Sequence, residues 1–256
     1  AGVQLRPVFP VVRSEVDFPD DHPMLEHFKY LATKTSVTPK ISIPGPSCCH
    51  FRVAPDDISP LQYRDVEVYT ADLARAYKKA VDTFYDAGCK YLQMDDIFFA
   101  YLCDPKHRAE KERLGQDPDW LIQRYAWMMN EAIKDRPSDM VIGMHMCRGN
   151  FMSTHAAEGS YDAVADTVFN QTGVDVFFME YDTDRAGGLE PLKFLSLFVT
   201  MPTSLPDASV TGMPEILCSA IKSSASESLL SFEIVTGLTT IPDSNFFTLR
   251  TTPLRP

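Results

Sequence analysis

The sequence predicts an α/β fold of the TIM (β/α)8-barrel type, and two observations carry that prediction. Short apolar segments alternate along the chain with segments whose apolar residues recur at helical spacing. The short segments are apolar almost throughout, which is typical of parallel strands buried on both faces of a sheet. A doubly wound sheet would give the same pattern, but the length of 256 residues is close to the ~250 residues of a single barrel.

The first part of the chain contains two predicted helices and two predicted strands. Residues 22–34 form the first helix, and the apolar segment at 40–44 is a strand that runs into Pro-Gly-Pro. Apolar residues at helical spacing predict a helix over 68–87, with Gly88 at its C-terminal cap. The segment YLQMD at 91–95 is the second predicted strand, and it ends in an acidic residue.

The middle of the chain repeats this order. A proline opens a predicted helix over 118–134, and MVIGMHMC at 140–147 is the next strand. A short helix at 161–171 precedes the apolar strand VDVFFME at 174–180. The segment at 189–200 begins as a helix and is compatible with a fifth strand.

The composition changes after residue 200. In residues 201–256, 17 of 56 residues are Ser or Thr and only eight are charged. Helical periodicity is weak there, although LLSFEIV at 229–235 is compatible with a strand. We therefore expect a barrel domain over 1–200 and treat 201–256 as a divergent end of the same domain.

Charge and cysteine content limit the classes of function. The formal net charge of −11 argues against a nucleic-acid or anionic-membrane surface, because both demand a basic footprint. No apolar run reaches the roughly 18–20 residues that span a bilayer, and the N-terminus lacks a signal-peptide pattern. With six cysteines in a chain of this size, reduced thiols in a cytoplasmic protein that acts on small molecules are expected.

Polar residues at three predicted strand ends are the candidate functional residues. In parallel α/β folds the carboxyl ends of the strands line the active site. Asp95 and Asp96 end one strand, His145 and Cys147 end the next, and Glu180 ends the third. Residues two apart on a strand face the same side, so His145 and Cys147 can reach one point. Imidazole, thiolate and carboxylate are ligands that zinc favours.

Each of these groups also has a structural interpretation. Either aspartate of the pair Asp95–Asp96 can cap a following helix. A histidine beside a cysteine can simply pack in a core, and Glu180 can belong to a solvated loop. Three such groups at successive strand ends give a zinc site equal weight with these structural interpretations.

Several motifs resemble the C-terminal domain family of cobalamin-independent methionine synthase (MetE), in particular its short single-domain members. They are LQMDD at 92–96, GMHMCRGN at 143–150 and FFMEYDTDRAGGLEPLKFL at 177–195. The PGPS segment at 44–47 is similar to a Gly-Pro loop of the family, and the resemblance covers roughly residues 25–200. It implies a (β/α)8 barrel of the type also used by uroporphyrinogen decarboxylase.

The resemblance further implies a zinc-dependent methyltransferase that moves a methyl group from 5-methyltetrahydrofolate to a thiol such as homocysteine. His145, Cys147 and Glu180 match three Zn²⁺ ligands, and Asp95 matches the residue that holds the amino group of homocysteine. Zinc would deprotonate the acceptor thiol, whose free pKa of ~8.5 makes it a poor nucleophile. The candidate acids that protonate the leaving nitrogen are Asp182 and Asp184; further candidate substrate contacts are Asp96, Arg148 and Arg185.

The sequence departs from the family at its end. The family supplies a fourth ligand, a cysteine followed by glycine, whereas the only later cysteine here is Cys218, in a helix-like context. The resemblance also places family strands before Ala1, so we expect a barrel that is incomplete or altered at both ends. Its unpaired strand edges predict either self-association or poor solubility. Two alternatives stay open: a non-catalytic barrel that has lost its last zinc ligand, and a metal-free lyase of the decarboxylase type.

Overall fold

The computed structural model describes residues 9–149, 154–180, 184–188 and 190–191, together with two strands at 232–233 and 246–250. Within these residues it contains helices and strands in the order that follows. They are α1 (Pro23–Ala32), β1 (Lys40–Pro44), α2 (Cys48–Phe51), η1 (Pro55–Asp57), α3 (Val66–Asp86), β2 (Tyr91–Asp95), α4 (Phe98–Tyr101), α5 (Pro105–Arg113), α6 (Pro118–Ile133), β3 (Val141–Met146), α7 (Asp162–Gln171), β4 (Val176–Glu180), η2 (Asp184–Ala186), β5 (Phe232–Glu233) and β6 (Phe246–Arg250).

The strands form one sheet in the order β1-β2-β3-β4-β6-β5. The first four are parallel, and their register aligns Pro44 with Asp95, Asp95 with His145, and His145 with Phe178. This confirms the predicted α/β class and the parallel arrangement of the four strands. Closure into a barrel and an incomplete end stay predictions.

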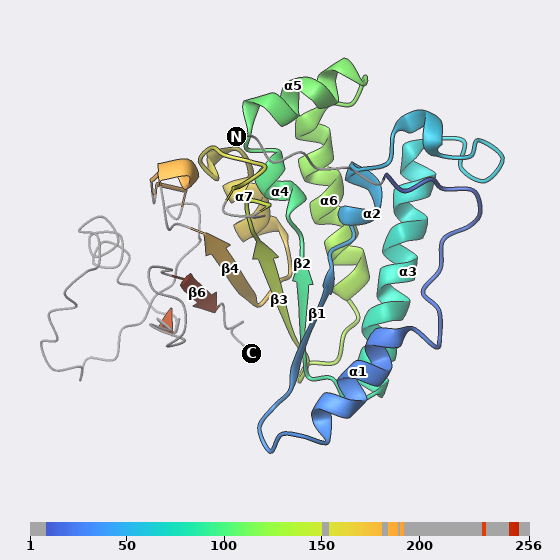
Figure 1. Cartoon of the computed structure of the whole chain (residues 1–256), viewed down its shortest axis with the longest axis vertical. Helices are drawn as coiled ribbons and strands as arrows, with labels where there is room; N and C mark the ends of the chain where they lie inside the picture. Colours follow the sequence, from blue (N-terminus) through green and yellow to red (C-terminus); the bar gives the residue numbers. More distant parts are fainter. Residues whose placement is uncertain are drawn as a thin grey trace, which may run out of the picture.

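The long helices α3 and α6 cover one face of this sheet, which we call the core face. Figure 1 shows α6 behind the sheet with α3 to its right. Side chains of the core face belong to the same buried cluster as the helix residues Phe84 and Tyr125. The core-face residues are Ile43, Leu92, Met94, Ile142, Met144, Met146, Phe177 and Met179.

The opposite face carries alternate residues of the same strands, and we call it the polar face. Its members Ser42, Gln93, Asp95 and His145 are partly exposed, whereas Glu180 is buried. Among the described residues, the core face is thus more completely buried than the polar face. Strands that look apolar throughout still direct their few polar side chains to one side, because successive side chains alternate.

Local sequence explains where the long helices begin and end. The side chain of Asp65 accepts a hydrogen bond from the backbone N–H of Val68 and caps α3. Gly88 follows α3 with φ +95°, a conformation that favours glycine. Asp117 caps α6. Pro118 occupies the first turn of α6, as predicted.

Two strands from the last part of the chain, β5 and β6, extend the sheet beyond β4. β6 pairs antiparallel with β4, and β5 pairs antiparallel with β6. The predicted strand at 229–235 is confirmed at Phe232–Glu233, whereas β6 was not predicted. Of the predicted element at 189–200, residue 189 and residues 192–200 lie outside the described residues, as does the boundary at residue 200.

None of the helices in the described ranges combines the length and the apolar character that a bilayer-spanning helix needs.

Candidate active site

The carboxyl ends of β2, β3 and β4 bring three of the predicted site residues together on the polar face. The Nδ1 atom of His145 lies 3.3 Å from Oδ1 of Asp95. On its other side, Nε2 of His145 lies 3.9 Å from Oε1 of Glu180. The imidazole therefore stands between two carboxylates, and parallel register is the reason, because it aligns the ends of adjacent strands.

A hydrogen-bond chain supports Asp95 from the side of β1. The amide of Gln93 donates to Oδ1 of Asp95 at 2.7 Å and accepts from Nζ of Lys40 at 2.9 Å. Burial acts to raise the pKa of Asp95, but hydrogen bonds from His145 and Gln93 outweigh it and lower the pKa below its usual value. Asp95 is therefore an ionised acceptor at neutral pH.

The second carboxylate oxygen of Glu180, Oε2, is fixed by two hydrogen bonds. Oε2 accepts a hydrogen bond from Nη2 of Arg185 at 3.1 Å and from the backbone N–H of Arg148 at 3.2 Å. These contacts orient the carboxylate so that Oε1 is the oxygen closer to His145.

Cys147 follows β3 and is half-buried. Burial raises the pKa of its thiol, the backbone around Gly149 lowers it, and the charges of Glu180 and Asp95 raise it further. The thiol is therefore protonated at neutral pH. Within the part of the chain that the structure describes, no three His, Cys, Asp or Glu side chains converge closely enough to hold a metal ion.

Arg148 contributes its main chain to this site, but its side chain is buried. The guanidinium lies 3.9 Å from the ring centroid of Tyr161 and is fully buried. Its three nitrogens have no hydrogen-bond partner among the described residues. The predicted contact of Arg148 with a substrate carboxylate is not tested by this arrangement and stays a prediction.

The predicted site residues after β4 fall into two groups. Arg185 contacts Glu180, and Asp184 is exposed at the start of η2. Asp182 and Cys218 lie outside the described residues.

Asp96 has a structural environment of its own, away from the polar face. It is fully buried and accepts a hydrogen bond from the hydroxyl of Ser47. Burial raises its pKa to about 6, although hydrogen bonds from Ser47 and the backbone N–H of Phe98 oppose the shift. A Cβ at Gly45 would lie 2.5 Å from Oδ2 of Asp96, so this close approach requires a glycine in the PGPS loop.

Sequence reasoning missed Gln93 and Lys40, which connect Asp95 to β1. A signal for Gln93 was present: it stands two residues before Asp95 on the same strand, and the two side chains therefore share a face. Lys40 carried no such signal, because its position opposite β2 depends on strand register.

No known protein-family profile matches the chain. Two curated proteins of Bacillus subtilis (strain 168) are similar in sequence. The uncharacterized protein YxjG is 43% identical over 186 residues, which cover 72% of this chain and 48% of YxjG. The uncharacterized protein YxjH is 44% identical over 185 residues, again 72% of this chain and 48% of the relative. The chain thus spans about half the length of these relatives.

A solved structure extends this similarity to the fold. A candidate vitamin-B12-independent methionine synthase from Listeria monocytogenes is 35% identical, with a TM-score of 0.56. The match covers 82% of this chain and 59% of the Listeria protein. In both sequence and fold, the chain is similar to a large part of a methionine-synthase-like protein.

Proposed function

We propose that this chain is part of a zinc-dependent methyltransferase that transfers the methyl group of 5-methyltetrahydrofolate to a thiol such as homocysteine, in methionine biosynthesis. The observation that carries the proposal is the alignment of Asp95, His145 and Glu180 across three adjacent strand ends. The similarity to the Listeria protein supports it. The arrangement of parallel strands and helices is compatible with the (β/α)8 barrel that the resemblance implies.

The residues present fit a zinc ion in their chemistry. Nitrogen, sulfur and carboxylate oxygen from His145, Cys147 and Glu180 form a donor set that zinc accepts. Two ligands on a tetrahedral Zn²⁺ lie roughly 3.3–3.5 Å apart, so the 3.9 Å between His145 and Glu180 needs only a small side-chain adjustment. Cys147 would have to move toward them, since no three-residue cluster is formed among the described residues.

Asp95 has a second role in this proposal. A histidine that binds zinc through one nitrogen commonly donates its other N–H to a carboxylate, which sets the tautomer and the ring orientation. Asp95 lies next to Nδ1 of His145 and leaves Nε2 directed toward Glu180. Asp95 would thus orient His145 in addition to, or instead of, contacting the amino group of homocysteine.

When bound, zinc would supply a deprotonated acceptor thiol at neutral pH. The chain would orient the reactants so that the new S–CH₃ bond forms as the N–CH₃ bond of the donor breaks. The nitrogen that leaves takes a proton, and Asp182 or Asp184 would donate it. Asp96, Arg148 and Arg185 are the further proposed substrate contacts, and among them Arg185 already holds Glu180.

Metal content and methyl transfer test this proposal in two steps. We expect about one zinc per chain, lost in Cys147→Ser and retained in Cys89→Ser, which changes a buried thiol before the amino end of β2, at the opposite end of the strand from Asp95. Transfer of methyl to homocysteine should be lost with the metal. A protein that binds no zinc would contradict the proposal and favour the metal-free lyase. Zinc without methyl transfer would favour a non-catalytic barrel.

A further inference from the structure

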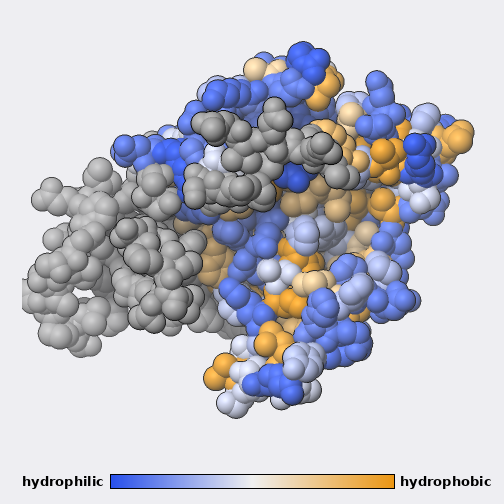
Figure 2. Space-filling view, in the orientation of Figure 1, coloured by the Kyte–Doolittle hydropathy of each residue, from blue (hydrophilic) through white to orange (hydrophobic). Residues whose placement is uncertain are grey.

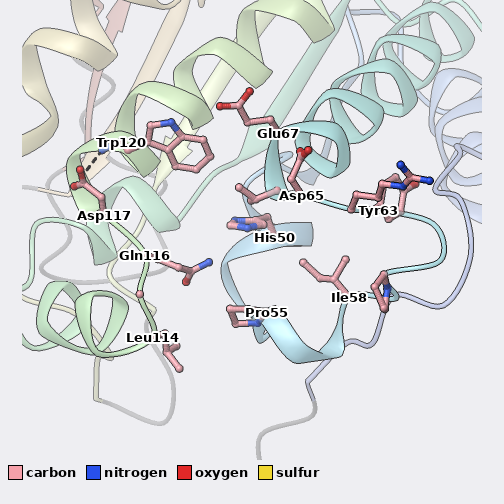
Figure 3. A pocket seen from close by; sticks show the side chains of 14 residues that line it. His50, Pro55, Ile58, Tyr63, Asp65, Glu67, Leu114, Gln116, Asp117 and Trp120 are labelled. Carbon is pink, nitrogen blue, oxygen red and sulfur yellow. Dashed lines mark hydrogen bonds between the residues drawn. The ribbon is translucent and has the colours of Figure 1, made fainter.

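A cavity of about 590 Å³ lies among the helices, apart from the polar face. It is bordered on one side by the chain from His50 of α2 to the first turn of α3 and on the other by the junction of α5 and α6, as Figure 3 shows. No residue of the polar face lines it. Its volume is in the range of small-molecule sites. We call it the helix-side cavity; the lining residues that matter here are His50, Ile58, Leu114, Gln116 and Trp120.

His50 offers a hydrogen-bond donor to this cavity. Figure 3 shows its imidazole in the middle of the lining residues. The ring is fully buried, its Nδ1 lies 2.8 Å from the hydroxyl of Tyr125, and its Nε2 has no hydrogen-bond partner among the described residues. Burial lowers the pKa of His50 to about 4, and the charges of Lys111 and Arg124 lower it as well, so the ring is neutral at pH 7.

The tautomer of His50 follows from counting donors. If Nδ1 carried the proton and donated to Tyr125, the buried hydroxyl hydrogen of Tyr125 would have no acceptor and Nε2 would have no donor. If the hydroxyl of Tyr125 donates to Nδ1 instead, only the N–H at Nε2 is left without a partner among the described residues. Because each buried unpaired polar group costs about 1–3 kcal/mol, the second arrangement is favoured.

Gln116 offers an acceptor in the same cavity. Its Oε1 atom is buried and has no hydrogen-bond partner among the described residues. Figure 3 shows the amide of Gln116 directed into the space beside His50. A donor and an acceptor without partners thus line one cavity, and buried polar atoms of this kind normally find a partner.

The walls indicate the shape and charge of a ligand. Trp120 presents a half-buried indole, and Ile58 and Leu114 add apolar surface. In the orientation of Figure 1, Figure 2 shows hydrophobic residues at the upper right, where the segment between α2 and α3 lies. The charged residues of the rim are mostly acidic and disfavour an anion: Asp65, Glu67 and Asp117 against Arg64.

We propose that the helix-side cavity binds an uncharged planar heterocycle whose edge carries a carbonyl beside an N–H, as in a purine nucleoside with a lactam ring. The carbonyl would accept from Nε2 of His50, the N–H would donate to Oε1 of Gln116, and the ring would lie against Trp120. This site is separate from the proposed methyl-transfer site, and either proposal can fail alone.

Inosine is the probe that tests this proposal on the whole chain. Trp120 lines the cavity, so inosine should quench tryptophan fluorescence to saturation. 1-Methylinosine lacks the N–H and should bind about tenfold more weakly, as expected for one lost hydrogen bond. Inosine 5′-monophosphate should also bind more weakly because of the acidic rim.

Substitutions of the lining residues test whether inosine quenches the fluorescence by binding in the cavity. His50→Phe and Gln116→Leu should each weaken inosine binding about tenfold, whereas Gln62→Leu, an exposed glutamine of the same segment outside the cavity, should not. If His50→Phe does not fold, Gln116→Leu decides. The proposal is overturned if inosine fails to bind at its solubility limit, if the monophosphate binds more tightly, or if neither cavity variant weakens binding.

Discussion

On the polar face, Asp95 lies between Gln93 and His145 and accepts from both sides, whereas in the helix-side cavity two buried polar atoms contact no partner among the described residues. The two regions differ in what their hydrogen-bonding groups still lack. On the polar face the described side chains pair with one another, and the proposed Zn²⁺ would still require Cys147 to move toward His145 and Glu180. The cavity has a donor and an acceptor left for a ligand, and burial makes their lack of partners unfavourable.

Removal of Glu180 should have the largest effect, because its carboxylate is buried and paired. Glu180→Ala leaves the half-buried Arg185 without this contact, so we expect the free energy of unfolding to fall by about 4 kcal/mol. Urea unfolding followed by circular dichroism measures it. The matched control is Glu158→Ala, which breaks an exposed pair with Lys106 and should cost less than about 1 kcal/mol. Equal losses in both variants would show that the polar face is not a tightly satisfied network.

The burial of His50 beside the helix-side cavity should make the free energy of unfolding depend on pH. His50 has a pKa of about 4 when folded, against an ordinary value of 6.5. The unfolded chain therefore binds a proton more readily between these values, and stability is lost as pH falls from about 6.5 through about 4. Relative to His50→Phe, we expect the wild-type free energy of unfolding to fall by roughly 3 kcal/mol over that window.

Urea unfolding at several pH values between 7 and 3.5 measures this difference. His27→Phe, which changes an exposed histidine of α1, serves as the control and should follow the wild type. The same pH dependence in the wild type and in His50→Phe would mean that the imidazole is not buried as a neutral ring.

Asp95→Asn tests the orienting role of Asp95 on the polar face. The substitution keeps the shape of the side chain but removes the charge beside Nδ1 of His145. We expect zinc affinity to fall by roughly 10- to 100-fold, measured by competition with a chromophoric chelator. Asp139→Asn changes an exposed carboxylate paired with Lys90 and should leave zinc affinity unchanged. An unaltered affinity in Asp95→Asn would restrict Asp95 to substrate binding.

The smallest effect is expected at Gln93. Gln93→Leu removes hydrogen bonds to Asp95 and Lys40, but the site is only partly buried and water can replace them. We expect the free energy of unfolding to change by less than about 1 kcal/mol. Thermal unfolding compared with Met94→Ala checks it, because Met94 points to the core face and its truncation should cost about 3 kcal/mol. Similar losses at the two neighbouring positions would erase the distinction between the two faces.

Much of the parallel core could be predicted from local patterns. Helical spacing and helix-end residues located α3 and α6 to within about two residues, because Gly88 and Pro118 act on their own helix ends. The short helices α2, α4 and α5 were not predicted. α2 and α4 are single turns of four residues, and α5 is almost entirely polar, so none shows a repeating apolar pattern.

The sequence predicted the residues of the candidate site better than it predicted the contacts between them. Strand-end reasoning singled out Asp95, His145 and Glu180, and they do lie together. It also grouped Asp96 with Asp95, although adjacent residues on a strand point in opposite directions and Asp96 is buried against Gly45. The cavity at His50 had no signal at all, since His50 and Gln116 are 66 residues apart in the chain.

By itself the sequence determined the order of helices and strands, the caps, and the polar groups at the ends of the strands, because these depend on residues close together in the chain. Only the tertiary structure decided the partners: which nitrogen of His145 faces which carboxylate, that Lys40 reaches Gln93, and that His50 and Gln116 line one cavity. Strand register and helix packing set those contacts, and both depend on the whole core rather than on any single segment.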